Sequence, residues 1–162
     1  SLAGTSQFKT QPAAQANPEN KTSRLVTKDD EPAAAAARNA VLAWAQAWSR
    51  RDVDSYIGAY TSDYAGPDQN GSRQAWMEQR RARILARNSI SVALDNLRLD
   101  KHGDIFIASF DQRYQSDGPI DRVHKRLSLV LDNGSWRIKR EVILPRTLAV
   151  SQSDNSHLAD RP

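Results

Sequence analysis

Two hydrophobic periodicities follow one another along the chain. Between Pro32 and about Asn88, apolar residues recur at intervals of three and four positions, which is typical of amphipathic helices. From Ile90 onward the interval becomes two, which is typical of strands with one buried face. The sequence therefore predicts an α+β fold, with three N-terminal helices packed on one face of an antiparallel sheet.

The helical half is divided by three residues that favour a helix start. They are Asp52, Ser72 and Pro32, the last of which comes directly after the acids Asp30 and Glu31. The first helix is expected to end at Arg50-Arg51, the second is short, and the third runs to about Asn88. Aromatic residues share one face of the first two helices at helical spacing. They are Trp44 and Trp48 on the first helix and Tyr56 and Tyr60 on the second.

The second half is predicted to form four strands joined by tight turns. A bulge is expected in the first strand near Asp95-Asn96. The strongest turn signal is Asp132-Asn133-Gly134, which is typical of a type I′ hairpin before the last strand. On the second strand, alternate residues are predicted to form the inner face. They are Phe106, Ala108, Phe110, Gln112 and Tyr114.

Two charged residues of the last two strands have notable positions. Lys125 is in phase with the apolar residues of the third strand, so it is predicted to point inward. Those apolar residues are Val123, Leu127, Leu129 and Leu131. In the last strand, Glu141 alternates with Trp136 and Ile138, so it points inward only if a bulge shifts the strand.

This order of elements resembles the nuclear transport factor 2-like cone fold, in which helices and a curved four-stranded sheet enclose a cup. The residues that carry the resemblance are Trp44, Trp48, Asp52, Tyr56, Tyr60, Trp76 and the segment 136–141. Over about residues 35 to 144, the chain is similar to C-terminal domains of bacterial L,D-transpeptidases and of tetratricopeptide-repeat envelope proteins. The matching segments are 47–60, 73–80, 110–116 and 125–127. The resemblance implies a periplasmic or cell-envelope location and a homodimer.

Polar segments are predicted to flank this domain. Residues 1–31 are rich in Gln, Ala, Asn, Pro, Ser and Thr, which is typical of a linker that tethers a domain to an upstream anchor or domain. Residues 32–145 form the predicted domain. Residues 146–162 are a polar tail.

The net charge of +4 is matched by a local excess on the third helix, where residues 72–88 hold five arginines and one glutamate. A basic helix suits phosphate or an acidic partner, but charged faces of helices are usually solvated. Binding of nucleic acid is not expected, because no aromatic platform is evident beside these arginines.

Composition excludes several other kinds of site. The chain has no cysteine and only three isolated histidines, so neither a metal site nor a cofactor is predicted. No apolar run approaches the roughly 20 residues that a membrane-crossing helix needs. No transmembrane segment is therefore predicted.

Eight residues are predicted to converge on the cup as a binding site. They are Tyr56, Tyr60, Trp76, Arg80, Gln112, Tyr114, Lys125 and Glu141. Flat aromatic rings beside fixed hydrogen-bonding groups suit a sugar or a small carboxylate. The hypothesis is a non-catalytic module that binds a cell-wall glycan or peptide fragment, or a protein partner. These side chains also have a purely structural interpretation, in which Lys125 pairs with Glu141.

A small isomerase, cyclase or hydrolase is the alternative. Such an enzyme needs a carboxylate base in the cup, and the inward phase offers none unless Glu141 turns inward. A carboxylate at an empty cavity beside Tyr56 or Tyr114 favours the enzyme. A cavity that is filled by these side chains favours a structural or protein-binding role.

Overall fold

The protein is described here by a computed structural model of residues 26–68 and 71–145. After a 3₁₀ turn, η3 (Lys28–Asp30), come α1 (Glu31–Ser49), α2 (Val53–Gly58) and α3 (Arg73–Leu85). Four strands follow: β1 (Ser91–His102), β2 (Ile105–Gln115), β3 (Asp121–Asp132) and β4 (Ser135–Leu144). Each strand pairs antiparallel with the next in the order β1-β2-β3-β4. The predicted α+β class is confirmed.

The helices begin where the sequence predicts. The Asp52 carboxylate accepts a hydrogen bond from the Ser55 amide at 3.2 Å, and the Ser72 hydroxyl accepts one from the Ala75 amide at 3.0 Å. Such side-chain caps satisfy amides that have no partner within the helix. Helix α3 ends at Leu85, three residues before the predicted end. The predicted linker, except for its last residues, and the predicted tail lie outside the described residues.

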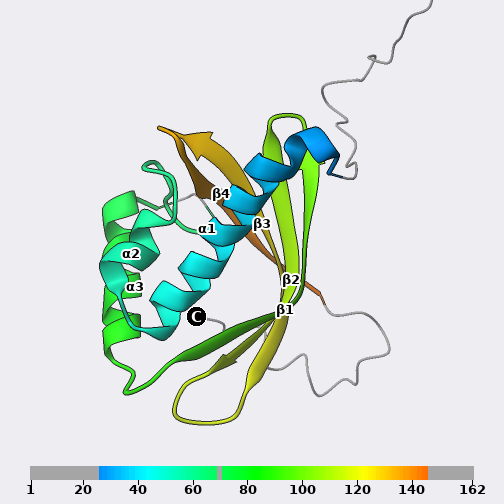
Figure 1. Cartoon of the computed structure of the whole chain (residues 1–162). Coiled ribbons are helices and arrows are strands. Elements are labelled where there is room, and N and C mark those ends of the chain that lie inside the picture. The colour runs from blue at the N-terminus through cyan, green and yellow to red at the C-terminus, as the bar shows by residue number, and fades with distance from the viewer. Residues whose placement is uncertain (1–25, 69–70, 146–162) are drawn as a thin grey trace, which may run out of the picture.

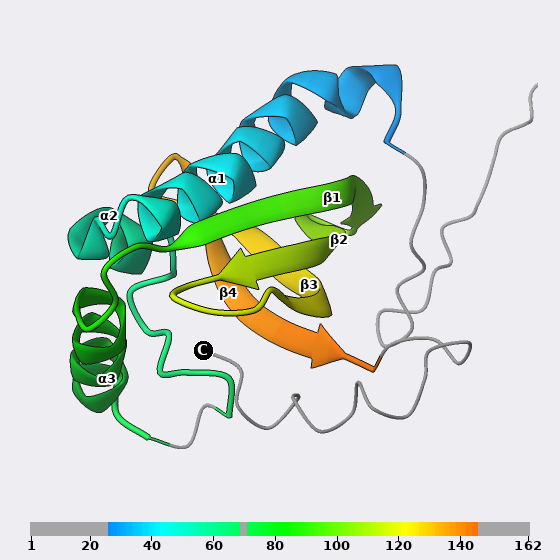
Figure 2. The same cartoon turned by 90° about the horizontal axis from the view of Figure 1, so that it is seen from below.

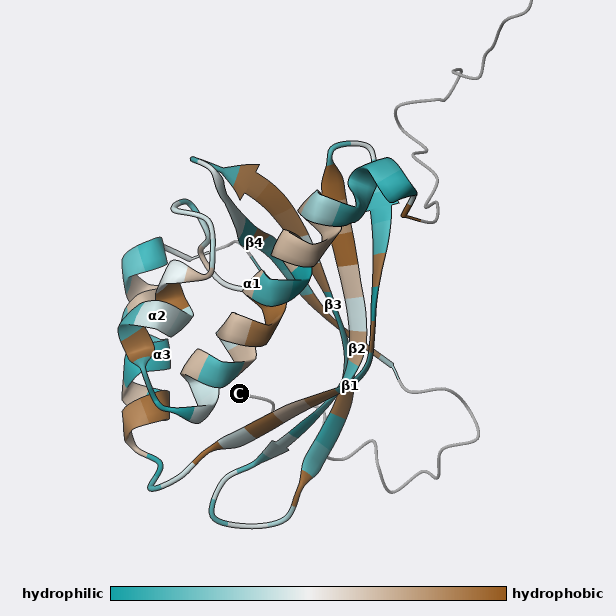
Figure 3. Cartoon of the chain, viewed as in Figure 1, coloured by the Kyte–Doolittle hydropathy of each residue, from teal (hydrophilic) through white to brown (hydrophobic). Residues whose placement is uncertain are grey.

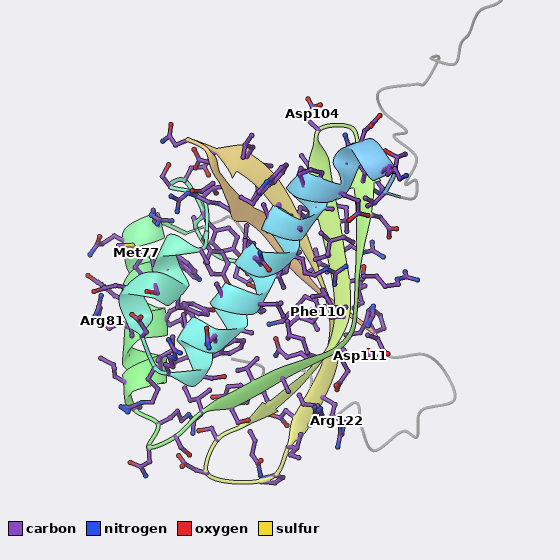
Figure 4. The ribbon with its side chains drawn as sticks, viewed as in Figure 1. Met77, Arg81, Asp104, Phe110, Asp111 and Arg122 are labelled. Atoms are coloured by element: carbon purple, nitrogen blue, oxygen red, sulfur yellow. The ribbon has the colours of Figure 1, made fainter. Side chains whose placement is uncertain are left out.

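The sheet curves around α1, which lies against its concave face, while α2 and α3 lie together at one end of the sheet (Figures 1 and 2). Hydrophobic and hydrophilic residues alternate along the strands (Figure 3). The predicted inner residues of β2 are all buried. Phe110 projects toward the helices, whereas Asp111 and Arg122 lie on the outer side of the sheet (Figure 4).

Two bulges interrupt the ladders. The first lies in β1 between Asp95 and Arg98, where it was predicted, and Asn96 has a positive φ of 56°. The second lies in β4, because Leu129 pairs with Ile138 while Ser128 pairs with Arg140. Lys139 is thus an extra residue, which reverses the side-chain phase from that point on.

The inner phase of β3 has one exception. Lys125 and its apolar neighbours up to Leu129 are buried, as predicted, but Leu131 is 59% exposed. Leu131 lies next to the β3–β4 turn, opposite Trp136, at the end of the strand. Alternation therefore predicts the face of the sheet on which Leu131 lies, but not whether a helix covers it.

Among the described residues, no helix is both long and apolar enough to cross a membrane. The longest is α1, with 19 residues, and exposed polar positions interrupt its apolar stripe.

Candidate functional site

An ion pair between Lys125 and Glu141 lies inside the cup. The Lys125 Nζ is 2.7 Å from Glu141 Oε2, and their side chains are 1% and 12% exposed. The bulge at Lys139 allows this ion pair to form, because it turns Glu141 to the inner face, opposite Leu127. The sequence predicts an inward Glu141 only if a bulge shifts the last strand; the bulge is present, so the cup contains a carboxylate.

The Tyr60 hydroxyl joins this pair to the helices. It donates to Glu141 Oε1 at 2.7 Å and accepts from Trp44 Nε1 at 3.0 Å. It also forms a hydrogen bond of 3.1 Å with the Tyr56 hydroxyl. Trp44 comes from α1, Tyr56 from α2, Tyr60 from the segment just after α2 and Glu141 from β4, so the network ties two helices to the sheet.

Aromatic faces surround the two buried cations. The Lys125 Nζ lies 5.3 Å from the ring centroid of Trp44 and 5.0 Å from that of Trp48. The Arg80 guanidinium lies 5.4 Å from the Trp48 ring and 5.3 Å from the Tyr56 ring. Contacts of this kind stabilise a cation by about 0.5–2 kcal/mol, more when it is removed from water.

The charges of the network follow from its contacts. Burial acts to raise the pKa of Glu141, but the Lys125 ammonium, the Tyr60 hydroxyl and the Arg80 charge together lower it below its usual value. Burial raises the pKa of both Tyr56 and Tyr60, although Arg80 opposes the rise at Tyr56. At neutral pH, Glu141 is therefore a carboxylate and both tyrosines are neutral donors.

The lowered pKa of Glu141 predicts a loss of stability in acid. Its pKa is lower in the folded chain than in the unfolded chain, so the stabilisation is present above the unfolded value of about 4.5. It is lost as the pH falls through the folded value. We expect urea unfolding from pH 6 to pH 2.5 to show a steeper decline in the free energy of unfolding for wild type than for Glu141→Gln. Parallel pH profiles would contradict the pKa assignment.

A cavity of about 230 Å³ adjoins the network where α3 faces β4. Its lining combines apolar, polar and charged side chains. They are Tyr56, Pro67, Trp76, Gln79, Arg80, Arg83, Glu141 and Ile143. Three exposed residues form the mouth of the cavity: Gln79, Arg83 and Ile143. Three buried residues form its inner wall: Tyr56, Trp76 and Arg80.

The chain matches the family model described as "Cds6 C-terminal NTF2-like domain" over residues 36–142, which is more than half of its length. It belongs to this NTF2-like family. No curated protein matches the chain. The confirmed family agrees with the cone fold that the sequence resembles.

Solved structures share the fold of this NTF2-like domain. Bd1075 from Bdellovibrio bacteriovorus is 24% identical with a TM-score of 0.62, and the match covers 75% of this chain and 44% of that one. The helical cell shape determining protein Pgp2 from Campylobacter jejuni is 16% identical with a TM-score of 0.53, covering 64% and 38%. The chain thus spans less than half of both proteins. A putative dehydratase from Streptomyces avermitilis is 15% identical with a TM-score of 0.61, covering 73% and 99%.

The eight predicted site residues occupy three places in the NTF2-like domain. Four line the cavity: Tyr56, Trp76, Arg80 and Glu141. Tyr60 donates a hydrogen bond to Glu141 and Lys125 forms an ion pair with it, but neither residue lines the cavity. Gln112 and Tyr114 are buried elsewhere in the cup, where the Tyr114 ring packs on Trp48 at a centroid distance of 5.3 Å.

Four lining residues were not among the predicted site residues. Arg83 had a visible signal, because it lies on the same side of α3 as Trp76 and Arg80. Gln79 follows Trp76 by three positions and had the same signal. Ile143 takes the inward phase only because of the bulge at Lys139. Pro67 approaches through a loop, and no sequence pattern indicates that contact.

The network lacks the donor set of a metal centre. Within residues 26–68 and 71–145, no group of three or more His, Asp or Glu side chains is arranged to hold a metal ion. The arrangement instead offers a flat indole, two guanidinium groups, a phenol hydroxyl and a carboxylate around one cavity, which are groups that orient a small polar molecule.

Proposed function

We propose that this NTF2-like domain is a non-catalytic binding module of a bacterial cell-envelope protein, and that its cavity receives a small polar ligand such as a cell-wall glycan or peptide fragment. The observation that carries the proposal is the lining of the cavity. Trp76 lines the same space as Tyr56 and Glu141. An aromatic wall beside fixed hydrogen-bonding groups suits a sugar ring or a short peptide.

The envelope setting is supported by two likenesses. One solved structure of the same fold is named a helical cell shape determining protein. The sequence also resembles C-terminal domains of L,D-transpeptidases. A protein partner and a homodimer belong to the same proposal, since β1 and β4 are edge strands and the resemblance implies dimers.

A small enzyme is the second candidate, and one observation favours it. Glu141 lines a cavity beside Tyr56, which is the arrangement expected of a carboxylate base. A general base is most effective when its pKa lies near the working pH. The pKa of Glu141 is lowered instead, and its two oxygens already accept from Tyr60 and Lys125. The binding role therefore explains the geometry better.

A thermal-shift screen tests the proposal with four probes: N-acetylglucosamine, N-acetylmuramic acid, dialanine and dialanine amide. At a concentration 100 times its Kd, a ligand that binds only the folded state adds about 2.7 kcal/mol. For a domain of this size, we expect at least one probe to raise Tm by several degrees.

Two matched tryptophan substitutions locate the binding. Ile143→Trp places a large side chain in the mouth of the cavity and should abolish the shift, whereas Leu131→Trp adds the same ring at an exposed position that does not line it. If none of the four probes shifts Tm, the small-ligand proposal is wrong and a protein partner is favoured. Chemical turnover of a probe would establish the enzyme alternative.

A further inference from the structure

Arg80 is a buried cation that forms no salt bridge with an acid of the described residues, although the charge of Glu141 acts on it from a distance. Arg80 is only 6% exposed, yet it forms part of the cavity wall. Its Nε and Nη2 atoms form no hydrogen bond with any described residue. A buried guanidinium normally pairs with a carboxylate, because leaving its N–H groups without acceptors is costly.

The aromatic contacts of Arg80 explain only part of its environment. The rings of Trp48 and Tyr56 lie 5.4 and 5.3 Å from the guanidinium and stabilise its positive charge. Cation–π contacts do not supply lone pairs for N–H groups, which donate in the plane of the guanidinium. The Tyr56 hydroxyl and Glu141 both act on the guanidinium, but neither forms a hydrogen bond with Nε or Nη2.

Arg83 adds a second guanidinium at the mouth of the same cavity. It lies three positions after Arg80 on α3, so both side chains project from one face of the helix. Within the described residues, Arg83 forms no ion pair with an acid. By contrast, Arg81 points away and pairs with Asp54 at 3.0 Å; Figure 4 shows it on the outer side of α3.

The charges at the cavity favour a carboxylate ligand. Glu141 is already paired with the Lys125 ammonium, whereas Arg80 and Arg83 form no ion pair with an acid among the described residues. A carboxylate carries a single negative charge, so Glu141 repels it less than it repels a phosphate dianion. A carboxylate also matches the planar fork of a guanidinium with two parallel hydrogen bonds.

We propose that the ligand of the cavity is a small carboxylate, whose anionic group binds Arg80 and Arg83 while its uncharged part lies against Trp76. This inference rests on the proposed binding function and specifies its ligand class. Each oxygen of Glu141 accepts one bond from the protein and keeps capacity for another. A hydroxyl, amide or ammonium donor of the ligand therefore binds at Glu141.

Two pairs of probes test the carboxylate directly by calorimetric titration. N-Acetylmuramic acid differs from N-acetylglucosamine by a lactyl group that carries a carboxylate, and dialanine differs from dialanine amide in its terminal charge. We expect at least one acid to bind about tenfold or more tighter than its neutral counterpart, as the loss of a charged hydrogen bond predicts. Increasing salt should weaken the binding of the acid more than that of the neutral probe.

Substitutions on α3 assign the interaction to its residues. Arg80→Met keeps an unbranched apolar stem, and we expect it to reduce the affinity for the acid by about 10- to 100-fold, with little effect on the neutral probe. Arg83→Gln lies at the exposed mouth and should cause a smaller loss of the same selectivity, so it serves as the test even if Arg80→Met fails to fold. Arg81→Met, on the outer side of the same helix, is the matched control and should bind as wild type does.

The outcomes separate the inference from the proposed function. If acid and neutral probes bind equally well, or if both arginine variants keep the preference for the acid, the carboxylate inference is wrong while the binding module stands. Tighter binding of inorganic phosphate than of either acid would also overturn it. If no probe binds at all, the failure lies with the proposed function.

Discussion

Replacement of Lys125 by methionine is expected to lower the free energy of unfolding by about 3–5 kcal/mol, the cost of removing one partner of a buried ion pair. The substitution keeps the apolar stem over Trp44 and Trp48 but leaves Glu141 without its cation. Burial, which acts to raise the pKa of this carboxyl group, is then opposed only by Tyr60 and Arg80 among its main partners. Urea unfolding at pH 7, followed by tryptophan fluorescence, measures the loss.

Lys139→Met is the matched control. Lys139 lies in the same strand as Glu141 and is 3.5 Å from Asp63, but both side chains are largely exposed. Exposed ion pairs contribute about 0–1 kcal/mol, so the control should unfold almost as wild type does. Equal effects of the two lysine substitutions would contradict the buried ion pair.

A double substitution distinguishes structure from function. Lys125→Met combined with Glu141→Leu removes both charges, and we expect it to recover most of the stability that the single change loses. If the double variant still binds its ligand as wild type does, the pair is structural, as the purely structural interpretation of the sequence predicts. If it is stable but no longer binds, Glu141 belongs to the binding site.

The fold could be predicted because its signals are local. The change of period from 3.6 to two separates helices from strands, Asp52 and Ser72 cap their own helices, and Asn133-Gly134 has the two positive φ angles of a type I′ turn. Each of these signals lies within a few residues of the structure that it determines. The long-range layout then follows from the need to cover one apolar face of the sheet.

The candidate site could be predicted only in part, because it depends on an irregularity. The bulge at Lys139 turns Glu141 and Ile143 inward, and no glycine or proline marks its position. The alternation of residues along a strand also predicts on which face of the sheet a side chain lies, but it does not predict which part of the cup that side chain reaches. Gln112 and Lys125 are therefore correctly placed in the cup, yet neither lines the cavity.

Replacement of Tyr60 by phenylalanine is expected to lower the free energy of unfolding by about 1–3 kcal/mol. The substitution leaves the ring packing intact and removes one hydroxyl, which accepts from Trp44 Nε1 and donates to Glu141 Oε1. The indole N–H then remains buried without an acceptor, and Glu141 loses a donor that helps to lower its pKa. Urea unfolding at pH 7 measures the change.

Tyr64→Phe provides the matched control at a neighbouring ring. Tyr64 is as buried as Tyr60, its ring centroid lies 4.5 Å from that of Tyr60, and its hydroxyl forms no hydrogen bond with any described residue. Removing a buried hydroxyl that has no partner removes a cost of burial, so Tyr64→Phe should be neutral or stabilising. A loss at Tyr64 as large as that at Tyr60 would show that burial of the ring, and not the hydrogen bonds of Tyr60, determines the effect.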